Sequence, residues 1–236
     1  MAYFIRTKRV AVMNRFKVYD TPHKGLRNAI AQFEMLAGSA DYSSALEIER
    51  LYMLGREVFG LLAIHAEDED RVTLAELATR CPGCSDHDME DHRRLESEQR
   101  ILEELLGHVF SKSKKGELVL DMGSHLYFGV SKFHGTYLLH IAEEETVTQC
   151  LLWEHFTDEE LAEHHDRIMQ RNPPTTLLAW FKFVLPAQNQ QERIGLFTAF
   201  RKRAPETLFR QAMAVARGVL ATEQYTDLAT SLGIAG

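Results

Sequence analysis

Two histidine–glutamate pairs in the chain have the spacing that places an imidazole and a carboxylate on one face of a helix. They are His65 with Glu69 and His140 with Glu144. Side chains four residues apart in a helix lie about one turn from each other on the same face. Imidazole nitrogens and carboxylate oxygens are ligands of transition metals, and a carboxylate can bridge two cations. The spacing therefore indicates metal binding by these two pairs.

Two further histidines lie at matching ends of other helices. Apolar residues at steps of three and four predict four amphipathic helices. His23 and His92 lie at the N-terminal ends of the first and third, and the His–Glu pairs lie at the C-terminal ends of the second and fourth. In an antiparallel up-and-down bundle these four ends lie on the same side. Residue 44 lies midway between His23 and His65, and residue 116 lies midway between His92 and His140; both fall in polar turns. Each pair of histidines would therefore come level after the chain runs about 30 Å along one helix and back along the next.

Each feature has an ordinary interpretation when it is taken alone. A single His-x-x-x-Glu pair is usually a solvated ion pair, and a single histidine in an apolar stripe is usually a partly buried core residue. Six such side chains gathered inside a bundle without a metal would cost several kcal/mol in unsatisfied polar groups. The agreement of four helices therefore favours a metal site.

The pattern along the chain predicts an almost entirely helical fold. Thr21-Pro22 should start the first helix, and Thr157 with Glu160 forms a capping box for the fifth. The expected four bundle helices span about 21–38, 45–70, 85–110 and 117–145, the last reaching as far as 156. Residues 70–86 are expected to be irregular, with one short helix at 73–80.

These residues resemble the hemerythrin-like (HHE cation-binding) domain over about residues 18–160. The resemblance rests on the runs 65–69 (HAEDE) and 140–145 (HIAEEE), on the two further histidines, and on 151–154 (LLWE). It implies an all-α, antiparallel up-down four-helix bundle holding two iron ions (Fe2+/Fe3+), bridged by carboxylates and by an oxo or hydroxo group. The metal ligands that it implies are His23, His65, Glu69, His92, His140 and Glu144, with the two glutamates as the bridging carboxylates.

The chain differs from the oxygen-carrying members of that family at two positions. Those carriers have a second histidine four residues before the third-helix ligand, where this chain has Asp88. Their last carboxylate is an aspartate five residues after the fourth-helix histidine, where this chain has Glu144 four residues after it. The glutamate pattern is similar to the iron-sensing and iron-repair branches. Asp88 is a candidate seventh ligand, or its position leaves an open coordination site.

We therefore expect a non-haem di-iron protein that binds or senses iron, O2, NO or peroxide through redox change, rather than an oxygen carrier or a classical enzyme. One alternative is a di-iron peroxidase or oxidase that turns over at the open position. A second is a metal-free or mononuclear-zinc helical adaptor that acts through its C-terminal surface.

Composition excludes several other classes. The 236 residues include 27 Lys and Arg and 34 Asp and Glu, a net charge of −7, so we expect neither nucleic acid nor a membrane as partner. Arg6, Lys8 and Arg9 interrupt the N-terminal segment, which is therefore not expected to be a signal sequence. Three cysteines do not make a disulfide framework. The expected location is the cytoplasm.

The Cys81-Pro82-Gly83-Cys84 segment precedes the third helix and has three interpretations. It is a simple loop turn, a redox pair, or a zinc site together with His87. Cys150 is expected in the core.

Several polar residues near the expected site have ordinary roles. Solvated helix-end charges are expected at Glu67, Asp68, Glu143 and Glu145, and a surface pair at His164-His165. His134 should lie on a different helix face. Tyr137, one turn from His140, is either a hydrogen-bond donor to it or a core residue.

The remainder, 161–236, is expected to be a helical extension beyond the bundle at 18–160. Asn172-Pro173-Pro174 interrupts the pattern, and helices follow at about 175–185, 189–203 and 205–231, the last with a candidate break at Gly218. Aromatic and basic residues are mixed in this segment. This extension should either dock on the bundle or offer a surface to a second copy or another protein.

Overall fold

The computed structural model describes residues 15–234, and within them all regular secondary structure is helical. The basic residues on which we based the expected lack of a signal sequence lie outside this range. The described helices are α1 Asp20–Ser39, α2 Ala45–Asp68, η1 Glu69–Thr73, α3 Leu74–Arg80, α4 Asp86–Lys114, α5 Leu120–Glu143, η2 Glu144–Thr148, α6 Gln149–His155, α7 Asp158–Arg171, α8 Pro174–Ala187, α9 Gln190–Arg203, α10 Glu206–Val219 and α11 Thr222–Ser231. The all-helical prediction is confirmed.

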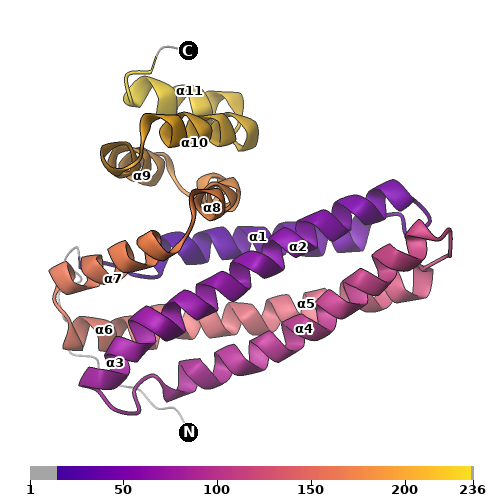
Figure 1. Cartoon of the computed structure of the whole chain (residues 1–236), viewed down its shortest axis with the longest axis horizontal. Helices are drawn as coiled ribbons and strands as arrows, with labels where there is room; N and C mark the ends of the chain where they lie inside the picture. Colours follow the sequence, from indigo (N-terminus) through magenta and orange to yellow (C-terminus); the bar gives the residue numbers. More distant parts are fainter. Residues whose placement is uncertain (1–14, 235–236) are drawn as a thin grey trace, which may run out of the picture.

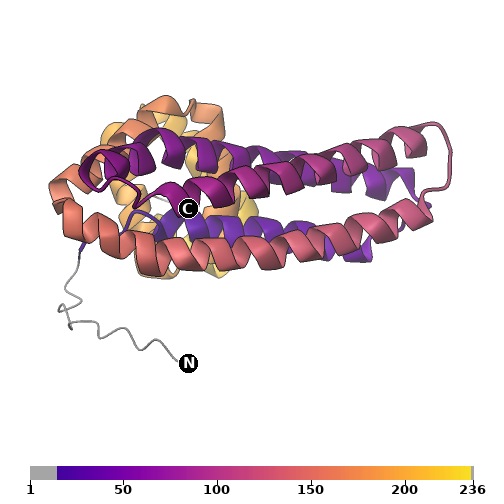
Figure 2. The same cartoon turned by 90° about the horizontal axis from the view of Figure 1, so that it is seen from below.

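The four longest helices lie side by side and alternate in direction (Figures 1 and 2). They contact one another in the cyclic order α1–α2–α4–α5 and back to α1. Their apolar stripes enclose one core, which includes Phe33, Phe59, Leu106 and Phe133. A Cβ atom at Gly55 would come within 2.5 Å of Leu106. Glycine therefore lets α2 approach its neighbours closely at this point.

The two short connections fall where the sequence predicts them. Ser44 caps α2 through a hydrogen bond from the backbone N–H of Glu47, and Gly116 adopts a φ of +77° after α4. A positive φ is strained for residues with a Cβ atom, so glycine suits this turn. Both connections lie at the same end of the long helices (Figure 1).

The short helix expected at 73–80 is confirmed as α3, but the irregular backbone expected between residue 70 and that helix is wrong. Instead, α2 continues through the π-helical turn η1 into α3, and only residues 81–85 lie outside helices. The fourth expected bundle helix is built in the same way: α5 continues through the π-helical turn η2 into α6. A π-turn accommodates an extra residue while the chain stays helical, so it shifts the phase of the apolar pattern. In a sequence, that shift resembles the end of a helix.

The later helices pack at one side of this core. The capping box of Thr157 and Glu160 is confirmed at the start of α7. Helix α8 lies on α1, where Val184 contacts the backbone around Gly25. Helices α9–α11 form a second apolar cluster with α8, which includes Phe181 and Phe197.

The candidate break near Gly218 is confirmed to within two residues. Helix α10 ends at Val219 and α11 begins at Thr222, so the chain leaves the helix just after this glycine. Across residues 15–234, no helix has the length and apolarity needed to cross a membrane.

Candidate metal centre

All six side chains that the resemblance implies as ligands are buried at the same end of the long helices. They come from four helices and the two π-turns: His23 from α1, His65 from α2, Glu69 from η1, His92 from α4, His140 from α5 and Glu144 from η2. None is more than 6% exposed. The structure therefore brings together residues that lie up to 121 positions apart in the chain, from 23 to 144.

The six side chains form two groups of ligand atoms that share Glu144, and Glu69 of the first group also faces His92 of the second. In the first group, Nε2 of His65 lies 3.2 Å from Oε1 of Glu69, and Nε2 of His23 lies 3.3 Å from Oε2 of Glu144. The second group uses the other oxygen of each carboxylate. There Nε2 of His92 lies 3.4 Å from Oε2 of Glu69 and 3.4 Å from Oε1 of Glu144. Each glutamate thus presents one oxygen to each group.

The fourth histidine completes the second group. Nε2 of His140 lies 3.4 Å from Oε1 of Glu144. Two ligands that each lie about 2.1 Å from a metal, at angles between a right angle and a tetrahedral one, are themselves roughly 3.0–3.4 Å apart. The nitrogen–oxygen distances therefore match the spacing of ligands around a cation.

Eight buried atoms in this cluster have no hydrogen-bond partner among the described residues. They are Nε2 of His23, His65, His92 and His140, and both carboxylate oxygens of Glu69 and of Glu144. Buried polar atoms in folded proteins are nearly always paired, because an unpaired one carries its full desolvation cost. Metal binding would satisfy all eight at once, so a pair of cations fits this donor set.

Burial favours the uncharged form of each histidine and glutamate in the cluster, whereas a neighbour of opposite charge favours the charged form. Burial lowers the pKa of His65 well below its ordinary value and also lowers that of His140, which favours the neutral imidazole that binds metals. Burial and the nearby Glu144 raise the pKa of Glu69. Burial alone would raise the pKa of Glu144, but contacts with His23 and His92 hold it well below its ordinary value. At least one carboxylate is therefore charged and available to a cation.

The outer nitrogens of two histidines are held by the acids that follow the two glutamates. Nδ1 of His23 lies 3.0 Å from Oε1 of Glu145, and Nδ1 of His92 lies 2.7 Å from Oδ1 of Asp70. Arg27 also donates to Glu145, at 2.9 Å. An acid at Nδ1 fixes the ring and the tautomer so that Nε2 faces the centre. The expectation that Glu145 is merely solvated is wrong.

Each glutamate is the first residue of a π-turn. The turns place a buried threonine four residues after each glutamate, namely Thr73 and Thr148. Thr148 donates to Oδ2 of Asp88 at 2.6 Å. Asp88 is buried, which raises its pKa to about 6, and it belongs to neither of the two ligand groups. The structure therefore places this candidate seventh ligand against Thr148.

Tyr19 is a buried residue of this region that sequence reasoning missed. Its ring stacks on His23 with centroids 4.9 Å apart, and its hydroxyl is buried without a partner among the described residues. Burial, together with the charges of Glu69, Glu144 and Asp88, raises its pKa well above the ordinary value. One signal was present in the sequence, because Tyr19 precedes His23 by four residues as Asp88 precedes His92. Tyr137 is buried in the core, and its ring lies edge-on to His140.

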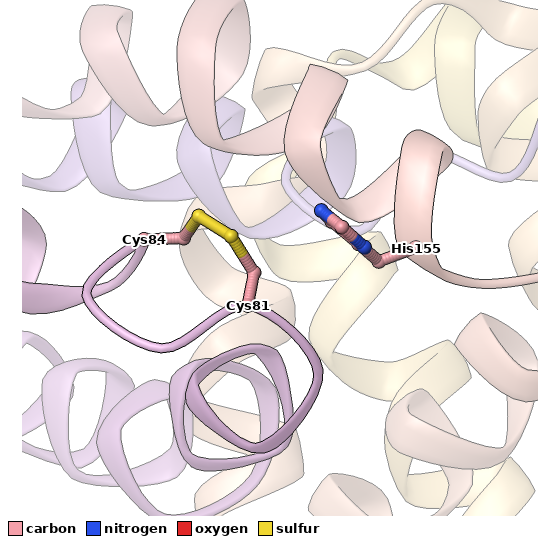
Figure 3. Close-up of side chains that lie close together, drawn as sticks. All are labelled: Cys81, Cys84 and His155. Atoms are coloured by element: carbon pink, nitrogen blue, oxygen red, sulfur yellow. A yellow bond between two sulfur atoms is a disulfide. The ribbon is translucent and has the colours of Figure 1, made fainter.

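The cysteine motif forms a disulfide between Cys81 and Cys84, and Figure 3 shows His155 beside it. His87 does not join it, since its Nε2 lies 3.3 Å from Glu143 on the surface. Cys150 is exposed, so its expected core position is wrong. It lies on the solvent face of α6, whose buried face carries Leu152.

Two expectations for polar residues nearby are also wrong. His164 is 2% exposed and packs edge-on against the ring of Phe156; only His165 of that pair is exposed. Asp68 is buried because Arg171 and Asn172 donate to its two oxygens. These partners come from a helix far along the chain, which a local pattern does not show. His134 faces Glu34 on α1, away from the centre.

We compared the chain with protein-family models, with curated proteins and with solved structures. None of the three comparisons found a match. The geometry of the residues themselves therefore carries the functional argument.

Proposed function

We propose that residues 18–160 form a hemerythrin-like four-helix bundle that binds two iron ions. The observation that carries the proposal is the set of eight buried, unpartnered ligand atoms contributed by four histidines and two glutamates. Without metal, these eight atoms would carry a desolvation cost that no hydrogen bond among the described residues offsets.

The division of ligands follows from the contacts. One cation would be held by His23 and His65, and the other by His92 and His140. Glu69 and Glu144 would bridge the two, because each presents one oxygen to each group. Two imidazoles and two carboxylate oxygens leave positions free around a six-coordinate ion.

The donor types favour iron over softer metals. The cluster has no sulfur, and imidazole with carboxylate is a donor set that suits iron. Oxygen-rich coordination stabilises the ferric state, which favours sensing or redox chemistry over reversible oxygen transport. When bound, the iron pair would supply redox change and an open position for a small ligand such as O2, NO or peroxide.

The residues of the chain orient and shield this centre. Asp70 and Glu145 hold two imidazole rings with Nε2 inward. Apolar packing from the core below, including Tyr137 and Ile141, separates the centre from the far end of the helices. Oδ2 of Asp88 accepts a hydrogen bond from Thr148, and Asp88 belongs to neither ligand group.

Metal analysis of the full chain, purified without chelators, tests the proposal. We expect about two iron ions per chain and a visible spectrum typical of a bridged di-iron pair. Removing iron with a chelator should lower thermal stability, because metal binding is coupled to folding. A chain without stoichiometric metal, whose stability is unaffected by chelators, would contradict the proposal and favour the helical adaptor. Continuous consumption of peroxide with an electron donor would instead identify an enzyme.

A further inference from the structure

We propose that Cys81, Cys84 and His155 form a second metal site, which binds a zinc-type divalent cation when the two cysteines are reduced and is closed by their disulfide. This site is separate from the His/Glu centre, and the proposal does not rest on the function of that centre. Its three ligand atoms, two Sγ and one imidazole nitrogen, all lie within 4.8 Å of one another.

The three side chains come from segments that the fold holds together. Cys81 follows α3, Cys84 lies just before α4, and His155 is the last residue of α6 (Figure 3). The backbone N–H of Cys84 donates to the carbonyl of Cys81 at 3.0 Å, which closes a tight turn. Gly83 supplies the positive φ of +88° that this turn needs. Two cysteines separated by two residues on such a turn are a frequent half of a zinc site.

Arg80 fixes the distance between the cysteine turn and His155. Its guanidinium donates to the backbone carbonyl of His155 at 2.6 Å and pairs with Glu160. The same group lies 4.1 Å from the ring centroid of Phe156. The arginine next to Cys81 therefore ties the end of α3 to the end of α6 through contacts that do not involve the disulfide.

Reduction of the disulfide and binding of the cation can both take place in the folded protein. A dithiol reductant gives two electrons and two protons to the disulfide, producing two thiols and its own disulfide. Binding of the cation then releases the two thiol protons, because thiolates are the ligands. Two thiolates and one imidazole are protein ligands of zinc in sites that keep a fourth position for water. Each of the three residues is partly exposed, so reductant and cation reach them without unfolding.

Zinc binding by the full chain in both redox states tests the inference. Metal-free protein is divided into an oxidised sample and a sample reduced with a phosphine, and both are loaded with zinc and freed of excess. We expect the reduced sample to retain one more zinc ion per chain than the oxidised sample. Equal zinc content in the two samples would overturn the proposal, because the His/Glu centre is the same in both.

Variants assign the extra zinc to these residues. C81S/C84S should bind equal zinc in both states, whereas C150S should keep the difference and serves as the matched control. H155A should still form the disulfide but lose affinity for the extra zinc by at least about tenfold, since even indirect partners of a metal contribute that much. Unchanged affinity in H155A would overturn the three-ligand site. If C81S/C84S does not fold, alkylation of the reduced thiols in the C150S protein replaces it.

Discussion

The two halves of the His/Glu centre are built on the same plan. One half consists of α1 with α2 and η1, and the other of α4 with α5 and η2. In each half the first helix contributes one histidine, and the second contributes His-x-x-x-Glu followed by a π-turn and a buried threonine. The acid after each glutamate bonds to a histidine of the opposite half. The two halves are therefore joined by Glu69 and Glu144, which each face histidines of both halves, and by the outer acids.

The two halves have different residues at the position four residues before their first histidine. In the second half Asp88 occupies this position and accepts a hydrogen bond from Thr148. In the first half the position is Tyr19, and the hydroxyls of Tyr19 and Thr73 are buried without partners among residues 15–234. The four histidines and two glutamates are thus arranged symmetrically, whereas the residues around them are not.

Loss of a shared ligand should have the largest effect. Glu144→Ala and Glu69→Ala each remove an oxygen from both ligand groups, so we expect each variant to lose more than half of its iron and to have a lower thermal midpoint. Metal analysis and calorimetry measure this. The control is Glu143→Ala, which changes an exposed neighbour. Normal iron content in either ligand variant would show that the carboxylates do not bridge.

Loss of a ligand from one half should have a smaller effect. His65→Ala and His140→Ala each remove one imidazole from a single group, so each should lose about half of the iron. The exposed His87→Ala serves as control. Complete loss of metal in only one of the two variants would break the equivalence of the halves and point to a site that fills in a fixed order.

The matched threonines should respond differently in the metal-free protein. Thr148→Val leaves buried Asp88 without its donor, and we expect the free energy of unfolding to fall by about 1–3 kcal/mol. Thr73→Val has the same shape change but removes an unpartnered hydroxyl, so its stability should stay equal or rise. Urea unfolding measures both. An equal decrease in the free energy of unfolding of the two variants would mean that the difference between the halves does not affect stability.

The outer acid Glu145 should give the smallest effect, and one that depends on pH. Burial alone would raise its pKa, but hydrogen bonds from His23 and Arg27 lower it from 4.5 to about 2. A lowered carboxyl pKa stabilises the fold fully above the unfolded value and loses this contribution as pH falls through the folded value. Glu145→Gln should therefore be less stable than the unmodified metal-free protein above pH 4.5, and the two should converge below it. A difference that is constant with pH would exclude this ion pair as the cause.

Local patterns predicted much of the helical fold and of the site. The six ligand positions could be proposed because helical spacing is a local property, and the turns at residues 44 and 116 follow from polar and small residues. The π-turns could not be predicted, since their phase shift resembles a helix end. The partners of Asp68 and Glu145 were also missed, because Arg171 and His23 lie far away in the chain.

The sequence by itself determined which side chains share a helix face, since a period of 3.6 residues follows from backbone geometry alone. Only the tertiary structure decided how the four ends meet, which acid faces which imidazole, and that the ring of Tyr19 stacks on that of His23. Such contacts depend on the rotation and spacing of packed helices. These are settled by side chains from every element together and not by any one segment.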